Sequence, residues 1–547
     1  MKKNVYLQYF LLTVVIGVVN NGYASQFVNN VSVKILTNIT KVKETQTDSV
    51  WRRHREKLIE DIQAAVSNTE SYTTAYLNDV QIQISNFVRL AVETGRADWM
   101  IDLMALYLLP YDHLQTVDKY TYYYKSNYTQ KPLDRQFKMW LSTPTKEIKF
   151  EWENILDISQ FLYPVSLLMV EAKRNPLIRN HPIAIEFVDK YLPVVFKDHY
   201  LRWIFSKDTS LSEVEGVFQS DGWGCMDEHG KSHGNYSGQK RIEYLIDKKF
   251  GKSTDSPLYC NAVQDKDLFI IAGAIHILAL QHENPELFSE EDQTDLGNLR
   301  DYVDLGIKLF GSGKSCENSE MSESRLTWCT ITNFQSEQVA VVNWDLGAWK
   351  GHSSYDYSAY DTPCFPGETD PTKKSYHKWD CHKKETTAWA EDFGYDLSHA
   401  RRLVRLLFTL DRYNTELNLI DQVYLDDMHR GMANQLAYGV FDGNFEDPYF
   451  TNYLDGTVGW YRVNYNGLNS GYSPYNWEDG GGGHSFLEGG YMFWSRYNSD
   501  LIAISIAAVN KRRDALEEGC NSGESEKRKN CYTLLQIAAS IPVEYYD

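Results

Sequence analysis

The sequence predicts an all-α protein, specifically an α/α toroid in which pairs of helices circle a central cleft and long aromatic-rich loops carry the chemistry. Apolar residues recur at three- and four-residue spacing in segments from Trp51 onward, which is typical of amphipathic helices. Runs of alternating residues at the spacing of a β-sandwich are not evident. Short and long connections alternate between the predicted helices. A plain helical bundle is the alternative, but the loops after residue 215 are too long and aromatic for simple connectors.

The first 24 residues have the pattern of a secretion signal. Lys2 and Lys3 precede the apolar run YLQYFLLTVVIGVV, and Gly22-Tyr23-Ala24 forms a small-x-small site before Ser25. The run is shorter than a membrane span requires, and the later segments contain no such span. We therefore expect a signal peptide over 1–24, a secreted or periplasmic protein, and no membrane association. A retained N-terminal anchor is the alternative.

Helical patterns fill most of the remaining chain, which we expect to form one catalytic domain over 25–547. In the first half they cover WRRHREKLIEDIQAAV, YLNDVQIQISNFVRLAVETG and ADWMIDLMALYLLPYDHL, the last stopping near Pro110. The Tyr-rich stretch YTYYYKSNYTQKPLDRQFKMWL that follows suits an extended excursion forming one wall of a cleft. The later helical patterns are ENILDISQFLYPVSLLMVEAKRN, PIAIEFVDKYLPVVFKDHYLRWIF, DKDLFIIAGAIHILALQH, DLGNLRDYVDLGIKLF, DLSHARRLVRLLFTLDRYN, IDQVYLDDMHRGMANQLAYGV and DLIAISIAAVNKRRDAL.

Composition narrows the class of partner. The formal net charge of −19 argues against nucleic acid and anionic membranes as partners. The 38 Tyr and 14 Trp exceed the needs of a core, and aromatic rings in exported proteins often cover the apolar faces of sugars. An acidic polysaccharide remains compatible with the charge if basic groups gather locally. We expect a monomer.

Eight cysteines in an exported chain predict disulfides. Neighbours in the sequence suggest the pairs Cys225–Cys260, Cys316–Cys329, Cys364–Cys381 and Cys520–Cys531. This pairing is chosen from loop length, and connectivity does not follow from sequence.

The chain is organised around residues 343–402. His352 lies among Tyr355, Tyr357 and Tyr360 in a run with too much Gly, Ser and Asp for a buried helix, and Trp349 precedes it. An imidazole and phenols can accept and donate protons, and a nearby guanidinium favours a phenolate. A Tyr-rich loop with a structural histidine is the alternative.

The segment DLSHARR at the end of this region resembles a helix start. Asp396 or Ser398 can act as N-cap, and His399 and Arg402 then share one helix face. Arg401 and Arg402 in a first turn oppose the helix dipole, which suggests a second use as a carboxylate clamp. An ion pair with a neighbouring carboxylate is the alternative.

Two further segments carry polar groups suited to a sugar. Asn261 stands before a predicted helix, where it could bind a substrate carboxylate or cap the helix. The loop 449–484 is rich in Asn, Tyr, Trp and Gly, and its candidates for substrate contact are Asn452, Tyr461, Arg462 and His484. The Gly run 480–483 lacks the Lys-Ser/Thr of a phosphate loop.

No cofactor or catalytic metal is expected. Cys225, His229 and His233, and likewise His377, Cys381 and His382, could ligate zinc, but disulfides and surface histidines explain them as well. A structural calcium ion bound by the Asp-rich loops is a further alternative. Signatures of zinc proteases and of α/β serine hydrolases are lacking from the sequence.

The order of Asn261, GHSSYDYSAY and DLSHARR resembles the polysaccharide lyases that have an α/α toroid, a group that includes alginate, glucuronan and chondroitin lyases. The His352–Tyr355 spacing is similar to that of the alginate-cleaving branch. Gly351 stands where the family has an Asn before the His, and the chain lacks a C-terminal β-sandwich pattern. The resemblance implies an acidic polysaccharide substrate.

The resemblance also implies β-elimination at a uronate. Asn261 with Arg401 or Arg402 would neutralise the carboxylate, and His352 or a Tyr would remove the C5 proton. Two alternatives stay open. One is a glycoside hydrolase on the same scaffold, using carboxylates among Asp345, Glu391, Asp392 and Asp455. The other is a glycan-binding protein without catalysis.

Overall fold

The computed structural model describes most of the chain from residue 74 onward. The described residues are 51, 55–56, 58–60, 62–63, 74–124, 127–143, 153–205, 224–226, 232–235, 237–250, 263, 265–309, 328–334, 337–343, 358–360, 378–379, 396–454, 456, 459–461, 471–472, 477 and 481–521. They are mostly helical, which confirms the all-α class predicted from the sequence. The predicted signal peptide lies outside them.

The chain divides into two compact units. Unit 1 comprises Met1–Arg55, Gly313–Val404 and Gln422–Asp547, and unit 2 comprises Glu56–Ser312 and Arg405–Asp421. Helix α12 (Leu397–Leu417) is continuous across the boundary, with its first residues in unit 1 and the rest in unit 2. The two units thus share a helix. The expectation of one domain over 25–547 stays a prediction.

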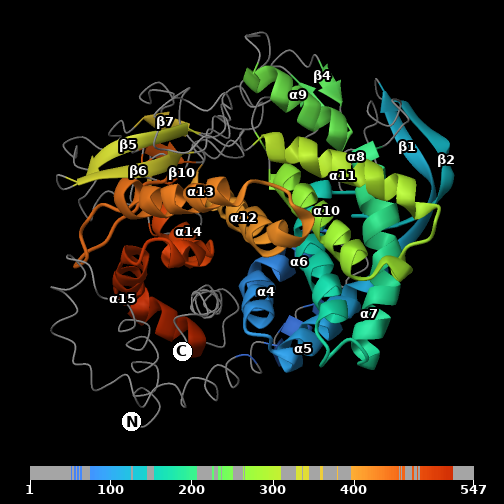
Figure 1. Cartoon of the computed structure of the whole chain (residues 1–547), viewed down its shortest axis with the longest axis horizontal. Helices are drawn as coiled ribbons and strands as arrows, with labels where there is room; N and C mark the ends of the chain where they lie inside the picture. The colour runs from blue at the N-terminus through green and yellow to red at the C-terminus, as the bar shows by residue number, and fades with distance from the viewer. Residues whose placement is uncertain are drawn as a thin grey trace. The chain divides into compact units, whose positions relative to one another are not determined.

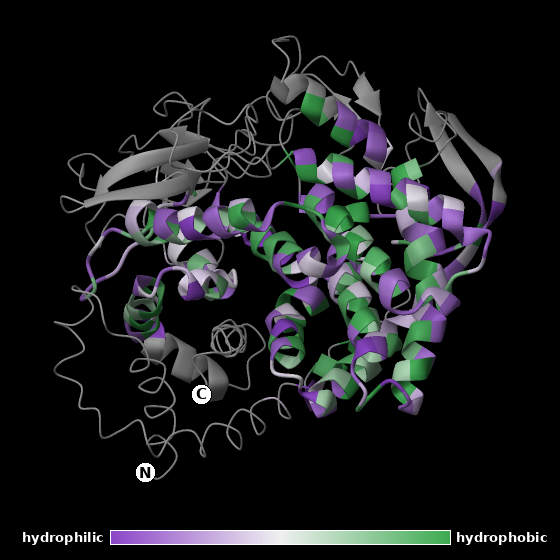
Figure 2. Cartoon of the chain, in the orientation of Figure 1, coloured by the Kyte–Doolittle hydropathy of each residue, from purple (hydrophilic) through white to green (hydrophobic). Residues whose placement is uncertain are grey.

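Unit 2 contains the predicted helices in the predicted order. They are α4 (Ala75–Glu93), α5 (Ala97–Leu108), α6 (Ile155–Arg174), α7 (Pro182–Pro193), α8 (Arg202–Phe205), α10 (Asp265–Glu283) and α11 (Asp292–Lys308), together with the second part of α12. Hydrophobic residues predominate where these helices face one another (Figure 2). The three- and four-residue periodicity therefore identified the helices, although α6 and α10 are buried on nearly all sides rather than on one face.

Short and long connections alternate along these helices. Short ones, 94–96, 175–181 and 284–291, follow α4, α6 and α10, whereas long ones, 109–154, 206–264 and 309–396, follow α5, α8 and α11. Helices joined by short connections pack as antiparallel neighbours. The long connections therefore leave from one end of the helix set and the short ones from the other.

Helix α6 lies at the centre of unit 2 (Figure 1), where it packs against α4, α5, α7 and α10. Asn154 caps its N-terminus, accepting hydrogen bonds from the amides of Leu156 and Asp157 at 3.0 and 3.4 Å. The helix is long and apolar enough to cross a membrane, but 94% of its most apolar stretch is buried inside the protein. Its apolar character is explained by its position in the core.

A π-helix, η3 (Val194–Leu201), continues α7 into α8. The π-turn inserts an extra residue per turn and so rotates the side chains that follow it. Asp198 and His199, both buried, lie in this turn.

The Tyr-rich stretch predicted to be extended forms a two-stranded hairpin. Strand β1 (Gln115–Tyr124) pairs antiparallel with β2 (Asn127–Met139), with a bulge between Val117 and Lys119. Pro110 lies in the short 3-10 helix η2 (Leu109–His113) that ends α5, as its missing amide hydrogen predicts.

Unit 1 contains α13 (Gln422–Asn434), its π-helical continuation η9 (Gln435–Val440), α14 (Gly482–Glu488), the 3-10 helix η11 (Tyr491–Arg496) and α15 (Asp500–Asn521). It also holds a hairpin of β5 (Trp328–Phe334) and β6 (Glu337–Asn343), which packs against α13. The sequence interpretation missed this hairpin, and in unit 2 it missed α9 (Gly238–Phe250) and the short strands β3 (Gly224–Met226) and β4 (Ser232–Asn235).

A small sheet in unit 1 joins two distant segments of the chain. Its strand order is β7 (Ser358–Tyr360), β9 (Gly459–Tyr461), β10 (Gly471–Tyr472) and β8 (Lys378–Trp379). The outer strands β7 and β8 come from the 343–402 region and the inner strands from the 449–484 loop. The two loops that the sequence selected therefore meet in one sheet.

Candidate functional site

An Asp–His pair begins helix α12. Asp396 accepts hydrogen bonds from the amide of His399 at 2.9 Å and from its ring Nδ1 at 2.8 and 3.0 Å. The carboxylate is thus both the N-cap of the helix and the partner of the imidazole, and its side chain is 1% exposed. The imidazole is 14% exposed. Because Nδ1 donates to the carboxylate, the neutral ring carries its lone pair on Nε2.

Asn452 joins the start of α12 to the start of α14. Its main-chain oxygen accepts from the amide of Leu397 at 2.9 Å, and its side-chain Oδ1 accepts from the amide of Gly482 at 2.9 Å. Asp396 also forms an isolated bridge with Tyr453. The predicted sugar-contacting residue Asn452 is buried, and its two bonds link the starts of α12 and α14.

Glycine is required where α14 meets this joint. A Cβ at Gly482 would lie 2.4 Å from the main-chain oxygen of Thr451. The close approach of the two backbones explains why residue 482 in the run 480–483 is a glycine. The sequence alone showed only that this run is not a phosphate loop.

Two of the predicted tyrosines lie in the small sheet. Tyr360 pairs with Gly459, and Tyr461 pairs with Ser358, in the antiparallel ladder of β7 and β9. The sheet therefore brings one predicted catalytic residue and one predicted substrate-binding residue onto adjacent strands.

The two arginines of DLSHARR differ. Arg402 is buried and its Nη1 donates to the main-chain oxygen of Ser398. Arg401 is half-buried. Of the two, Arg401 thus has the side chain with more access to solvent, which a substrate clamp requires.

His484, the remaining described candidate, lies in α14, where its Nε2 is 3.5 Å from Glu488 Oε1. The other predicted site residues, Asn261, Trp349, His352, Tyr355, Tyr357 and Arg462, lie outside the described residues. So does at least one cysteine of every predicted disulfide. These predictions remain predictions.

Among the described residues no cluster of His, Cys, Asp and Glu has the arrangement of a metal site. The zinc and calcium alternatives rest largely on segments beyond those residues.

Unit 2 holds a buried charge cluster that the sequence interpretation missed. Arg202 donates from Nη1 and Nη2 to the two carboxylate oxygens of Glu153 at 2.8 and 2.5 Å, and Trp203 Nε1 donates to Glu153 at 3.2 Å. His199 Nε2 lies 3.9 Å from the same carboxylate, and Nδ1 donates to the main-chain oxygen of Val194 at 2.8 Å. Burial, reinforced by the charge of Arg202, lowers the pKa of His199 to about 3, so this imidazole is neutral.

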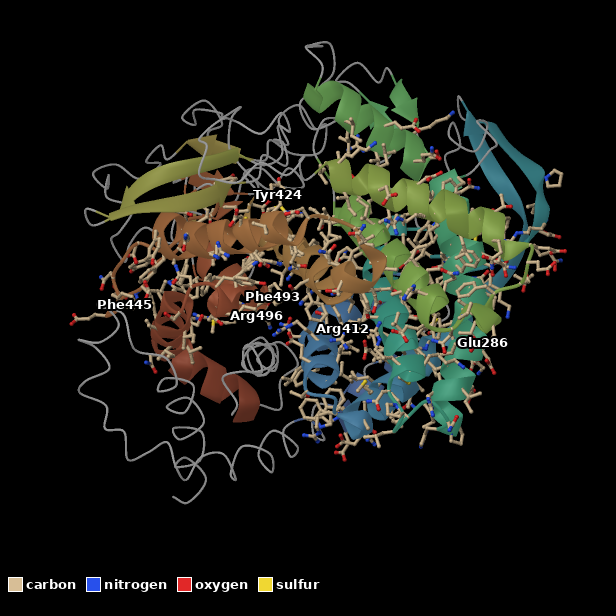
Figure 3. The ribbon with its side chains drawn as sticks, in the orientation of Figure 1. Glu286, Arg412, Tyr424, Phe445, Phe493 and Arg496 are labelled. Atoms are coloured by element: carbon tan, nitrogen blue, oxygen red, sulfur yellow. The ribbon has the colours of Figure 1, made fainter. Side chains whose placement is uncertain are left out.

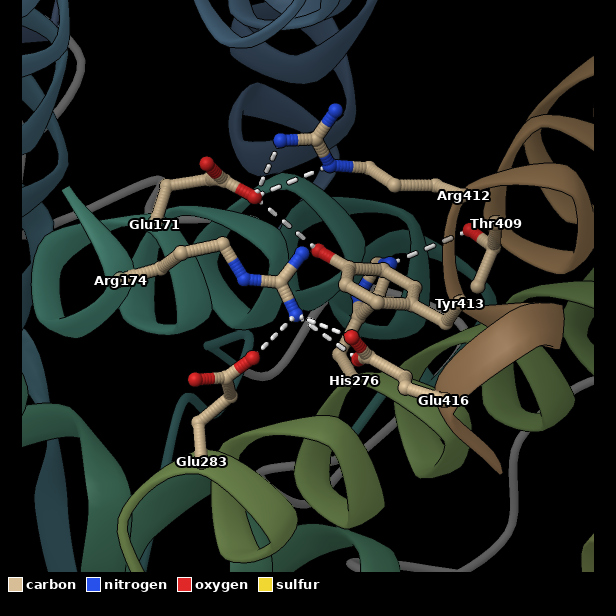
Figure 4. A network of polar contacts seen from close by, with 8 residues as sticks. All are labelled: Glu171, Arg174, His276, Glu283, Thr409, Arg412, Tyr413 and Glu416. Atoms are coloured by element: carbon tan, nitrogen blue, oxygen red, sulfur yellow. Dashed lines mark hydrogen bonds and ion pairs between the residues drawn. The ribbon is translucent and has the colours of Figure 1, made fainter.

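A second network ties together the ends of α6, α10 and α12 (Figure 4). Arg412 donates from Nε and Nη2 to Glu171 Oε1 at 2.9 and 2.7 Å. Arg174 Nη2 donates to Glu416 at 2.7 and 2.8 Å and to Glu283 at 3.1 Å. All three helices end here, so the network lies at the end of unit 2 from which the short connections leave.

The same three helices share a buried hydroxyl–imidazole chain. His276 contacts Ser166 Oγ through Nδ1 at 2.8 Å and Thr409 Oγ1 through Nε2 at 3.1 Å. Burial and the charge of Arg412 lower the pKa of His276 to about 3. The imidazole is fully buried, so this chain joins α6, α10 and α12 and does not reach a substrate.

Unit 1 has a comparable core histidine. Trp494 Nε1 donates to His429 Nδ1 at 3.0 Å, and the imidazole stacks on the ring of Tyr497 at 4.6 Å between centroids. Arg496 lies over the ring of Phe493 at 4.6 Å (Figure 3). Burial and the nearby Arg496 lower the pKa of His429 to about 3.

Comparisons with known protein families, with curated proteins and with solved structures found no match for this chain.

Proposed function

We propose that this protein is an exported polysaccharide lyase that cleaves a uronate-containing polymer by β-elimination. The observation that carries the proposal is the Asp396–His399 pair at the start of α12, held beside the joint at Asn452. A partly exposed imidazole with its tautomer fixed by a buried carboxylate is suited to proton transfer.

The helix order supports the toroid that the sequence predicted. Helix α6 packs on both α4 and α10, while α5 packs on α7. These contacts between alternate helices, α4–α6–α10 and α5–α7, agree with the inner and outer rings of an α/α toroid. We propose that α4, α6, α10 and α12 form the inner ring, with α5, α7 and α11 outside.

In the proposed reaction His399 Nε2 takes the proton from C5 of the uronate. The C4–O bond then breaks, a C4=C5 double bond forms, and the leaving oxygen receives a proton from a phenol, for which Tyr360 is a candidate. Arg401 offsets the charge that develops on the carboxylate in the transition state. In this scheme His399 takes the base role that the resemblance implies for His352 or a Tyr, and Asn261 keeps its implied role at the carboxylate. No cofactor takes part in this scheme.

The test is incubation of the purified protein with alginate, glucuronan and glycosaminoglycans, with ultraviolet absorbance used to follow the unsaturated product. We expect turnover of at least one polymer. His399→Ala should lower the rate about 100- to 10,000-fold, as loss of a general base does. Asp396→Asn should also lower the rate, since an amide no longer fixes the ring tautomer.

The matched control is His282→Ala, because His282 is exposed at the end of α10 in unit 2. It should retain full activity. Release of reducing sugar without an unsaturated product would replace the lyase with a glycoside hydrolase, and binding without any cleavage would leave a glycan-binding protein.

A further inference from the structure

We propose that Tyr491 is a positioning residue for the Asp396–His399 pair, because its hydroxyl fixes the first turn of α12, from which the carboxylate holds the imidazole. Its effect on the rate rests on the proposed function, whereas its effect on the imidazole can be measured without a substrate. All three residues belong to unit 1.

Leu397 is the residue through which Tyr491 acts. It directly follows Asp396, and its main-chain oxygen accepts a hydrogen bond from the Tyr491 hydroxyl at 2.5 Å. On its other side, the Leu397 amide donates to the main-chain oxygen of Asn452 at 2.9 Å. Because peptide groups are planar, the two bonds fix the peptide planes before and after Leu397. The backbone of the N-cap is therefore held from two separate segments of the chain.

The direction of the Asp396 carboxylate depends on this backbone. The amide and the ring Nδ1 of His399 both donate to the carboxylate, which is 1% exposed. Such a cap requires the N-cap residue and the residue three positions further on to keep one relative geometry. When the turn loosens, the carboxylate no longer holds the ring proton on Nδ1, and Nε2 loses the lone pair that accepts a proton.

The ring of Tyr491 is itself held firmly. It is 1% exposed and stacks on Phe486 and Trp494, with ring centroids 6.0 Å apart in each pair. Gly490 precedes it with a φ of 78°, in the left-handed region, and a Cβ at Gly489 would lie 2.4 Å from the ring. A donor whose ring is locked by packing is suited to positioning another group.

Apolar packing explains the ring of Tyr491 but not its hydroxyl, since phenylalanine fills the same space and stacks in the same way. A buried hydroxyl that only satisfies its own hydrogen bond is the alternative, and α12 offers a direct comparison. Tyr163, buried in unit 2, donates to the main-chain oxygen of Arg405 at 3.1 Å. Arg405 lies eight residues after Leu397, about 12 Å along the helix. The two tyrosines thus make the same bond to one helix, and only the bond of Tyr491 lies at the proposed site.

The test compares Tyr491→Phe with the matched control Tyr163→Phe, both in the full chain. The first measurement needs no substrate. It is NMR of the histidine ring nitrogens at a pH where His399 is neutral, with its signals assigned by their loss in His399→Ala. We expect Nδ1 of His399 to carry the proton in the parent and in the control, and the proton to shift in part to Nε2 in Tyr491→Phe. An unchanged tautomer in Tyr491→Phe would overturn the proposal.

The second measurement is the rate of elimination of a polyuronate. We expect Tyr491→Phe to lower kcat about 10- to 100-fold and to leave KM within about twofold, since a misplaced base slows the chemical step without weakening binding. Tyr163→Phe should keep kcat within about twofold, although each variant loses one buried hydrogen bond and should unfold at a similarly lower urea concentration. Equal losses of kcat would mean that the Tyr491 hydroxyl supports only the fold, and the proposal would be wrong.

A double variant shows whether Tyr491 acts through the carboxylate. With Asp396→Asn the ring tautomer is already unfixed, so adding Tyr491→Phe should lower kcat by no more than about twofold further. A full additional loss would contradict the positioning role.

The two proposals fail in different ways. If the parent eliminates no polymer, the lyase is rejected, and a shifted His399 tautomer in Tyr491→Phe still supports the positioning role. Elimination by the parent together with an unshifted tautomer in that variant rejects the positioning role and leaves the lyase standing.

Discussion

Gly273 in α10 lies against the ring of Tyr200, and a Cβ at this position would be 1.9 Å from the phenolic oxygen. Both residues are buried in unit 2, so the Tyr200 ring would have to shift within a packed core. Gly297 in α11 has nothing within 4 Å of the corresponding Cβ. Packing against Tyr200 therefore requires a glycine at 273, whereas packing does not require one at 297.

We expect Gly273→Ala to lower the free energy of unfolding by about 1–3 kcal/mol, since overpacking forces the aromatic ring to shift. Gly297→Ala should instead raise it by about 0.5–1 kcal/mol, because alanine has the higher helix propensity. Urea unfolding of both variants checks this. A stabilised Gly273→Ala variant would show that the ring can move at little cost.

Single residues with local partners could be predicted from the sequence. Asp396 was identified as a candidate N-cap, and the structure confirms it, because a cap depends on residues three positions apart. Its second bond, to the His399 ring, follows from the same spacing. Asn452 could be selected as polar and loop-borne, but its joint with Leu397 and Gly482 depends on contacts 30 or more residues apart, which no local pattern encodes.

At the scale of elements, the Glu171–Arg412 pair fastens α6 to α12. Glu171 is 4% and Arg412 22% exposed in their side chains. Arg412→Met would leave a buried carboxylate without its cation, whereas replacing both partners removes the charge altogether. Burial and the charge of Glu171 also raise the pKa of the neighbouring Tyr413 well above its usual range, so the phenol stays neutral and donates to the carboxylate at 3.4 Å.

We therefore expect Arg412→Met to cost about 3–5 kcal/mol of unfolding free energy, and Glu171→Leu/Arg412→Met to cost clearly less than the sum of the single variants. The control is the exposed pair Arg300–Asp304, where a cycle should give less than about 0.5 kcal/mol. Additive losses at Glu171 and Arg412 would mean that the pair does not act as a unit.

Most helices were predictable because apolar residues recur every three or four positions along them, whereas α6 and α10 are long apolar segments buried on nearly all sides. Helix α9 was missed because its charged sequence GQKRIEYLIDKKF offers few apolar positions. The β5–β6 hairpin was missed because the sequence between the two strands has no Gly, Pro or Asn-Gly signal, although Thr330, Ile331 and Thr332 favour strands. Its packing against α13 is a tertiary effect.

At the scale of the whole molecule, three histidines that are buried in the described part of the chain link folding to pH. Burial lowers the pKa of His199, His276 and His429 to about 3, against 6.5 for an exposed imidazole. Between about pH 6.5 and pH 3, these three imidazoles are therefore protonated in the unfolded chain and neutral in the folded protein. Stability is complete above pH 6.5 and falls as the pH drops through this window.

Between pH 7.5 and 5 we expect a loss of about 2 kcal/mol for each histidine, roughly 4 in unit 2 and 2 in unit 1. Denaturant unfolding at several pH values, with probes in each unit, measures it. His429→Gln should remove the contribution from unit 1 alone. Stability that stays flat down to pH 5 would show that the imidazoles become protonated without unfolding.

The continuity of α12 has a consequence for dissecting the protein. Its eight residues before Arg405 and the thirteen from Arg405 onward belong to different units, yet they form a single hydrogen-bonded rod. An eight-residue fragment is too short to stay helical alone, so a gene cut at that boundary would melt the very turns that carry Asp396 and His399. Fragments that end or begin at this boundary should therefore lose helical structure in their part of α12. Proteolytic cleavage at the same place should likewise destabilise the helix on both sides of the cut.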